Sequence, residues 1–171
     1  MFDLDIARMG YTILYKNDKS FFGKMIEKTQ IKRGVPAEFA CYTHVEISGG
    51  GQWAVNVAPP KIRISDVSKV HKGRIARICR YKGIDYEDRK RYKIAFWAAS
   101  MSNLDYDIPG VLRFILPIIA QFPSSFFCSE GWLWAHRREY PEIFKGVIPA
   151  NCMPGHIAAS RDMETVWEGL I

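Results

Sequence analysis

Cys128 lies near the start of a predicted helix, a position that can activate a thiol. Ser125 is typical of a helix start, and Trp132 and His136 follow at helical spacing, so the pattern predicts a helix over residues 125–138. Free backbone N–H groups and the helix dipole in a first turn can lower a cysteine pKa from about 8.5 to ~3.5–7.5. One of these N–H groups can also bind an oxyanion. The alternative is a buried, inert thiol, the commonest state of a free cysteine.

His44, which could act as the base for such a thiol, lies in a predicted β-hairpin. Residues 42–48 and 52–58 form two strand-like runs around three glycines at 49–51. If all three glycines form the loop, His44 faces Asn56, with the two Cβ atoms about 5 Å apart. Asn56 could then orient an imidazole nitrogen of His44. A change of one residue in the loop would break this pairing.

Two further polar residues share the His44 face of this hairpin, while the opposite face is apolar. They are Tyr42 and Glu46. This polar face is either functional or simply exposed to solvent, and the pattern does not choose between the two. Glu46 lies two residues beyond His44 on the same face and is the alternative partner for its imidazole.

The other predicted elements place this hairpin between helices. Ser20 can cap the first helix, and acidic residues in the first turn support a later one. Because the strands are not interleaved regularly with helices, the order predicts an α+β fold rather than repeated βαβ units. The periodicity predicts strands over residues 11–16 and 74–81, and helices over 20–30, 85–102 and 108–121.

Composition limits the domain organisation and the classes of partner. A chain of 171 residues, 48% of them hydrophobic, can build one core, so one domain over residues 1–171 is expected. The net charge of +6 favours an anionic partner such as a cell-wall polymer, a membrane surface or a nucleic acid. Since no recognised nucleic-acid-binding module is present, nucleic-acid binding is not expected.

Cysteine and histidine spacing gives no sign of a metal site. The four cysteines form no CxxC pair, and His71, His136 and His156 show no paired ligand spacing. We therefore expect free thiols, no metal and no organic cofactor. Cys41 and Cys79 are predicted to be core residues.

The sequence predicts a soluble protein without a signal peptide. The first five residues include two acidic ones and are followed by no long apolar run. The most apolar stretch, residues 111–122, contains Arg113 and Pro117 and is too short to span a bilayer. The chain is therefore expected to be cytoplasmic as synthesised, with any export by another route, including transport on a particle.

Two motifs resemble a known family. Residues 42–47 (YTHVEI), a glycine-rich turn and residues 53–58 (WAVNVA) resemble the hairpin of the circularly permuted NlpC-type papain-like hydrolases. This branch includes the YiiX-like proteins and, more remotely, lecithin:retinol acyltransferase. Residues 127–130 (FCSE) resemble its Cys-Ser-Glu nucleophile motif, and histidine before cysteine is the permuted order. The resemblance spans roughly residues 10–160. One departure is Asn56, where many members carry Glu.

The resemblance implies a papain-like fold, with a small antiparallel sheet or half-barrel packed against helices, and a cysteine peptidase or amidase that forms an acyl-enzyme. Cys128 would be the nucleophile, His44 the base and Asn56 its orienter, as in other Cys-His-Asn triads. Tyr42 or Tyr106 would donate to the oxyanion.

Three functions remain open at this point. The family's usual substrates suggest peptidoglycan stem peptides. The acyltransferase relatives and the apolar residues 111–122 suggest instead a lipid-directed acyltransferase or thioesterase in peripheral contact with a membrane. The change at Asn56 leaves a third reading, in which a non-catalytic binding or particle-structural domain keeps only the fold.

Overall fold

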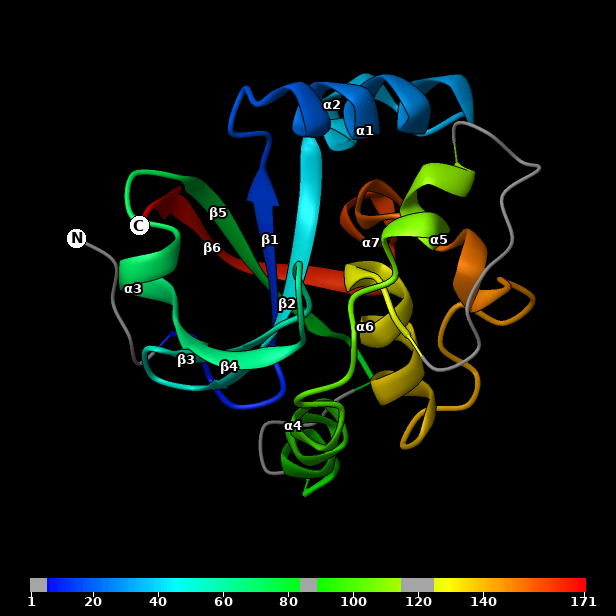
Figure 1. Cartoon of the computed structure of the whole chain (residues 1–171). Helices are drawn as coiled ribbons and strands as arrows, with labels where there is room; N and C mark the ends of the chain where they lie inside the picture. The colour runs from blue at the N-terminus through cyan, green and yellow to red at the C-terminus, as the bar shows by residue number, and fades with distance from the viewer. Residues whose placement is uncertain (1–5, 84–88, 115–124) are drawn as a thin grey trace.

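The computed structural model describes residues 6–83, 89–114 and 125–171, and they form an α+β fold (Figure 1). A six-stranded antiparallel sheet has the strand order β4-β3-β2-β1-β5-β6. The strands are β1 (Thr12–Lys16), β2 (Tyr42–Gly50), β3 (Trp53–Asn56), β4 (Arg63–Asp66), β5 (Ile75–Tyr81) and β6 (Met163–Leu170). The helices are α1 (Phe21–Lys32), α2 (Ala37–Ala40), α3 (Val67–Val70), α4 (Lys90–Ser100), α5 (Ile108–Arg113), α6 (Cys128–Arg137) and α7 (Pro154–Ala159), with a 3-10 turn at Pro149–Asn151.

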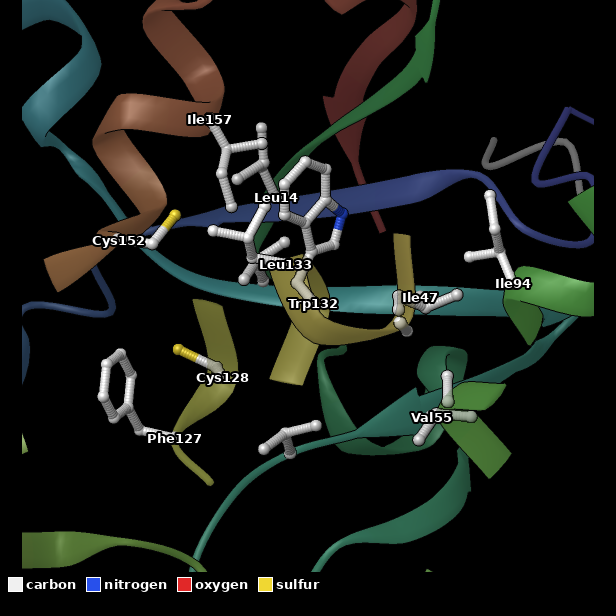
Figure 2. Packing of buried hydrophobic residues seen from close by; sticks show 14 of the residues in the cluster. Leu14, Ile47, Val55, Ile94, Phe127, Cys128, Trp132, Leu133, Cys152 and Ile157 are labelled. Carbon is white, nitrogen blue, oxygen red and sulfur yellow. The ribbon is translucent and has the colours of Figure 1, made fainter. Parts of the chain in front are cut away.

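The sheet is covered on both faces, because apolar side chains alternate to either side of its central strands. One face carries Leu14 and Ile47, which pack against Trp132 and Leu133 of α6 (Figure 2). Helices α4 and α7 contact β2 on this side as well. The other face carries a second cluster, made by the following buried residues: Ala7, Tyr11, Ile13, Tyr15, Ala54, Val67, Ala76 and Ile78.

Several local predictions are confirmed. Strands β1 and β5 lie within a residue of the predicted bounds. Helix α1 is capped as expected, since the Ser20 hydroxyl accepts a hydrogen bond from the Gly23 N–H over 3.0 Å. All four cysteines are free thiols. In the described part of the chain, no helix is both long enough and apolar enough to cross a membrane.

Other boundaries differ from the predictions. Helix α6 begins at Cys128 rather than at residue 125, with Phe127 as its N-cap residue. Helix α4 begins at Lys90, and the predicted start at 85–88 lies outside the described residues. Helix α5 starts where expected, but most of the predicted apolar segment 111–122 also falls outside them. Strands β4 and β6 were missed because both are edge strands with mixed polar patterns.

The predicted pairing of the hairpin is wrong by two residues. Gly49 and Gly50 extend β2, and the turn falls at Gly51 and Gln52. Ile47 therefore pairs with Val55 and Ser48 with Ala54, with an irregularity between Ser48 and Gly50. His44 pairs instead with Tyr15 on the neighbouring β1. A shift of two residues keeps His44 and Glu46 on their predicted face, because the side-chain period of a strand is two. Tyr42 does not share that face, since a register irregularity separates it from His44 and it packs with Val45 and Ile47.

Candidate active site

Cys128 is the first residue of α6, the ten-residue helix that packs across β2. An acidic Glu130 in the first turn and a basic Arg137 in the last both suit the helix dipole. The Cys128 side chain is nearly enclosed, with a relative exposure of 5% for the residue. The structure therefore puts this thiol in the first turn of a helix, as the sequence predicted, and at the edge of the apolar core.

His44 of β2 meets Cys128 on one side and Glu46 on the other. Burial opposes charging of the imidazole, but hydrogen bonds to Cys128 and Glu46, and the charges of both, raise the pKa of His44 to about 10. The His44 Nε2 atom lies 3.3 Å from the Glu46 Oε1 atom. Since Nε2 faces Glu46, we infer that the other ring nitrogen, Nδ1, makes the hydrogen bond with the Cys128 thiol.

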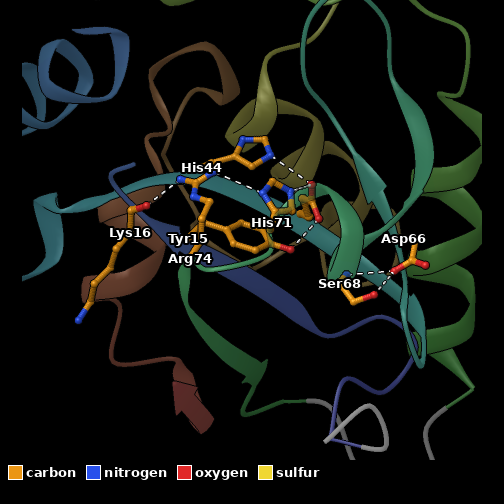
Figure 3. A network of polar contacts seen from close by, with 8 residues as sticks. Tyr15, Lys16, His44, Asp66, Ser68, His71 and Arg74 are labelled. Carbon is orange, nitrogen blue, oxygen red and sulfur yellow. Dashed lines mark hydrogen bonds and ion pairs between the residues drawn. The ribbon is translucent and has the colours of Figure 1, made fainter. Parts of the chain in front are cut away.

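Glu46 is a fully buried carboxylate that is surrounded by hydrogen-bond donors. Three of its partners, Tyr15, His44 and His71, are labelled in Figure 3. The Glu46 Oε1 lies 2.8 Å from the Nε2 of His71, in addition to the contact with His44. Its Oε2 accepts a hydrogen bond of 2.9 Å from the Tyr15 hydroxyl. Burial would raise the pKa of Glu46, yet the two histidines lower it to about 2. Glu46 is therefore held as an anion that can orient His44.

Arg74 contacts the Nδ1 side of the His71 ring and so favours one tautomer of it. The Arg74 guanidinium lies 3.4 Å from the Nδ1 of His71 and also donates to the Lys16 carbonyl over 2.7 Å. A guanidinium can only donate, so Nδ1 must accept and the ring proton must sit on Nε2, which then donates to Glu46. The Tyr15 ring stacks on His71 with centroids 3.9 Å apart and restrains it further.

The same cluster is the candidate metal site of the described residues, since ligand atoms of His44, Glu46 and His71 lie within 4.8 Å of one another. Arg74 argues against this use. A metal at Nε2 of His71 would need that atom deprotonated and Nδ1 protonated, which would direct an N–H at the guanidinium. The donor set therefore suits a hydrogen-bonded network better than a metal ion.

Sequence reasoning missed His71. It follows α3, lies 27 positions after His44, and belongs to no local motif. The only related signal in the sequence was the alternation on β2, which put Glu46 on the His44 face. It did not indicate which residue would meet the carboxylate of Glu46.

Asn56 does not orient His44 through its side-chain oxygen. The residue is 2% exposed, and its Oδ1 finds no hydrogen-bond partner among the described residues. The register explains this result, because the β2–β3 pairing that sets Ile47 opposite Val55 moves Asn56 two positions from its predicted place opposite His44. Glu46, the alternative partner, makes the contact instead.

The two tyrosines expected to support an oxyanion have different surroundings. The Tyr42 hydroxyl donates to Glu168 of β6 over 2.8 Å and is thereby directed away from Cys128. The cause is the register irregularity next to Lys16, the β1 partner of Tyr42. Tyr106 lies beside Cys128, and burial together with the charge of the thiolate raises the pKa of its hydroxyl. Tyr106 therefore stays protonated, and of the two tyrosines it is the one beside Cys128.

Two hollows meet at the Cys128–His44 pair. The apolar hollow, which includes Phe127, Cys128 and Met153, is narrow, with an enclosed volume of about 20 Å³. The polar hollow, which includes His44 and Asn56, has about 700 Å³, counted with its open mouth. Ile26, Thr43 and Tyr106 line both hollows. A molecule crossing from one to the other would pass the thiol and the imidazole.

Comparison with known proteins does not identify a family for this chain. No model of a protein family matches the chain, and no curated protein matches it either. The likeness to permuted papain-like hydrolases therefore stays a prediction from the sequence motifs.

Proposed function

We propose that this chain is a cysteine hydrolase, an amidase or peptidase of the permuted NlpC-type papain-like class. One observation carries the proposal: His44 lies between the thiol of Cys128 and the buried carboxylate of Glu46. This is the order of nucleophile, base and orienting acceptor that activates a thiol. The first-turn position of Cys128 supports the same role.

In the proposed reaction, His44 takes the proton of Cys128 and the thiolate attacks a substrate carbonyl carbon. The Cys128 backbone N–H and the Tyr106 hydroxyl stabilise the oxyanion. The carbon–nitrogen bond then breaks, and His44 passes its proton to the leaving amine. A water molecule, deprotonated by His44, hydrolyses the thioester and restores the thiol. Glu46 keeps the imidazole in one orientation throughout.

Peptidoglycan stem peptides are the proposed substrate class. Support comes from the resemblance of residues 42–58 and 127–130 to the NlpC-type motifs. The net charge of +6 also suits an anionic wall polymer. Release of peptide fragments from purified sacculi, lost in Cys128→Ala, would support this assignment, and intact sacculi after treatment with the wild-type protein would contradict it.

Alkylation by iodoacetamide at pH 6 tests the activated thiol. Cys41 is more exposed than Cys128, so accessibility alone predicts faster labelling of Cys41. The proposal predicts the opposite order, because His44 lies beside Cys128 and can accept its proton during the reaction, whereas no base is proposed for Cys41. His44→Ala should slow labelling of Cys128 and leave that of Cys41 unchanged. Equal or slower labelling of Cys128 in the wild-type protein would refute the proposal.

The apolar hollow beside Cys128 favours a second candidate, a lipid-directed acyltransferase or thioesterase. Val111, Phe114 and Phe127 could contact an acyl chain there. Hydrolysis rates of acyl thioesters of increasing chain length would separate the two candidates. Rates that rise with chain length favour this alternative, whereas a preference for peptide amides favours the amidase. A protein that labels at Cys128 but turns over neither class would favour the non-catalytic domain.

A further inference from the structure

The polar hollow beside His44 carries a side chain whose hydrogen-bonding capacity the protein does not use. Asn56 is 98% buried at the end of β3 and lines this hollow, and its Oδ1, itself shielded from solvent, has no partner in the described part of the chain. Buried amide oxygens are nearly always hydrogen-bonded, so an exception needs an explanation. Since His44 is held by Glu46, orienting the base does not supply one.

A cation stands next to this amide. Arg63 of β4 is the direct cross-strand partner of Asn56, and both line the polar hollow. Directly opposed residues point to the same face, with Cβ atoms about 5 Å apart. The guanidinium of Arg63 and the amide of Asn56 can therefore contact one molecule together.

The charges around the hollow favour an anion. Arg63 and Arg74 both line it, and Asp18 is the only carboxylate among its described lining residues. The Asp18 Oδ1 atom already accepts the Ser20 N–H over 2.9 Å. Guanidinium groups bind carboxylates with paired hydrogen bonds. Arg74 is held by its contacts with His71 and the Lys16 carbonyl, and its unpartnered Nε is buried, whereas Arg63 is exposed and is the cation that can reach a ligand at this end.

We propose that this hollow binds the leaving half of the substrate, and that the leaving half is an amine bearing a carboxylate, as in an amino acid or short peptide. A rotation of the Asn56 amide turns its Oδ1 toward the hollow to accept an N–H of the leaving amine, and Arg63 pairs with the carboxylate of that amine. The inference rests on the proposed acyl-enzyme. As the carbon–nitrogen bond breaks, the acyl group stays on Cys128 and the proton of His44 goes to the amine nitrogen next to Asn56.

Capture of the acyl-enzyme by added amines tests the subsite, because an amine that attacks the thioester follows the leaving-group path in reverse. The enzyme is acylated with p-nitrophenyl butyrate, and glycine is compared with glycinamide at equal concentrations of free amine. The measurement is the ratio of N-butyryl product to butyrate. We expect glycine to capture the acyl group at least about tenfold better than glycinamide, since one charge-assisted hydrogen bond supplies that factor.

Three variants separate the two contacts. Arg63→Gln should bring the glycine and glycinamide ratios together. Asn56→Leu should lower capture of both amines relative to hydrolysis. Asn56→Asp keeps an acceptor for N–H but repels a carboxylate, so glycinamide capture should persist while glycine capture falls. Lys61→Gln removes a nearby exposed cation outside the hollow and should leave the wild-type preference unchanged.

The outcomes distinguish failure of the subsite from failure of the enzyme. If Cys128→Ala releases p-nitrophenol as fast as the wild-type protein, the acyl-enzyme itself is refuted. If the acyl-enzyme forms but captures glycine and glycinamide equally, the subsite is refuted and the hydrolase stands. A wild-type preference for glycine that survives unchanged in Arg63→Gln also overturns the assignment.

Discussion

Two histidines of this protein, one half-buried and one fully buried, have opposite pKa shifts. His44 lies on the sheet between Cys128 and Glu46, and its pKa rises to about 10. His136 of α6 is fully buried, and its ring stacks on the Trp132 ring with centroids 4.1 Å apart. Burial lowers the pKa of His136 to about 4. Its Nδ1 donates to the Trp132 carbonyl over 2.9 Å, while its Nε2 has no partner among the described residues.

Burial therefore does not decide the state of a histidine here; its partners do. Desolvation disfavours the charged form at both positions, and only His44 has a carboxylate and a thiol to offset it. The network around Glu46 is thus what distinguishes a base from a core residue. Changes to that network should affect His44 far more than changes of similar size elsewhere.

Glu46→Gln should have the largest effect on this comparison. The amide group turns an N–H toward histidine N–H donors and removes the charge that raises the His44 pKa. We expect kcat/KM for p-nitrophenyl butyrate to fall by roughly 10²–10⁴-fold, the range of general-base contributions.

The same variant tests a stability effect with a defined sign. The Glu46 pKa is lower in the folded protein, so its stabilisation is present above the unfolded value near pH 4 and is lost toward pH 2. Urea unfolding of the wild-type protein should weaken over that range, and Glu46→Gln should show a smaller decrease. Equal kcat/KM in both proteins would mean that Glu46 does not orient His44.

His71 should act on His44 only through Glu46. His71→Met removes the Nε2–H donor, while His71→Gln keeps an N–H near the same place. We expect a loss of about tenfold or more in activity for Met and substantial rescue for Gln. The pH–rate profile should shift only in the Met variant, since Glu46 then loses the N–H of His71 and keeps His44 as its only histidine partner. Equal losses with unshifted profiles would indicate a purely structural role.

His136→Phe should change stability without changing the active site. A neutral folded-state His136 resists protonation, so wild-type stability should decline as pH falls from about 6.5, the unfolded value, to about 4. The contribution amounts to about 3 kcal/mol at its limit. The phenylalanine variant should lack that part of the decline in urea unfolding between these pH values. An identical pH dependence in both proteins would contradict the assignment of a low pKa to His136.

The smallest expected difference in stability is between two tyrosine–carboxylate hydrogen bonds. Tyr15 donates to the buried Glu46, whereas Tyr42 donates to the partly exposed Glu168, which Lys16 and Arg77 also neutralise. Tyr15→Phe should cost about 1.5–3 kcal/mol in unfolding free energy, and Tyr42→Phe about 0.5–1.5 kcal/mol. Only Tyr15→Phe should alter the pH–rate profile. A larger destabilisation by Tyr42→Phe would reverse the comparison.

Local sequence patterns carried much of the fold. The Ser20 cap, the strands at residues 12–16 and 75–81, and the helix that begins at Cys128 follow from periodicity and capping within a few residues. The position of the thiol in a helical first turn was predictable for the same reason, as was the shared face of His44 and Glu46 on one strand.

The partners of His44 were decided by tertiary structure. Two glycines that stay in β2 set a register that separates Asn56 from the imidazole, and an irregularity beside Lys16 turns Tyr42 toward β6. His71 reaches Glu46 from 25 positions away. Spacing in the sequence alone cannot predict these contacts. They depend on which strands pair and on which donors reach the buried carboxylate of Glu46 in the folded protein.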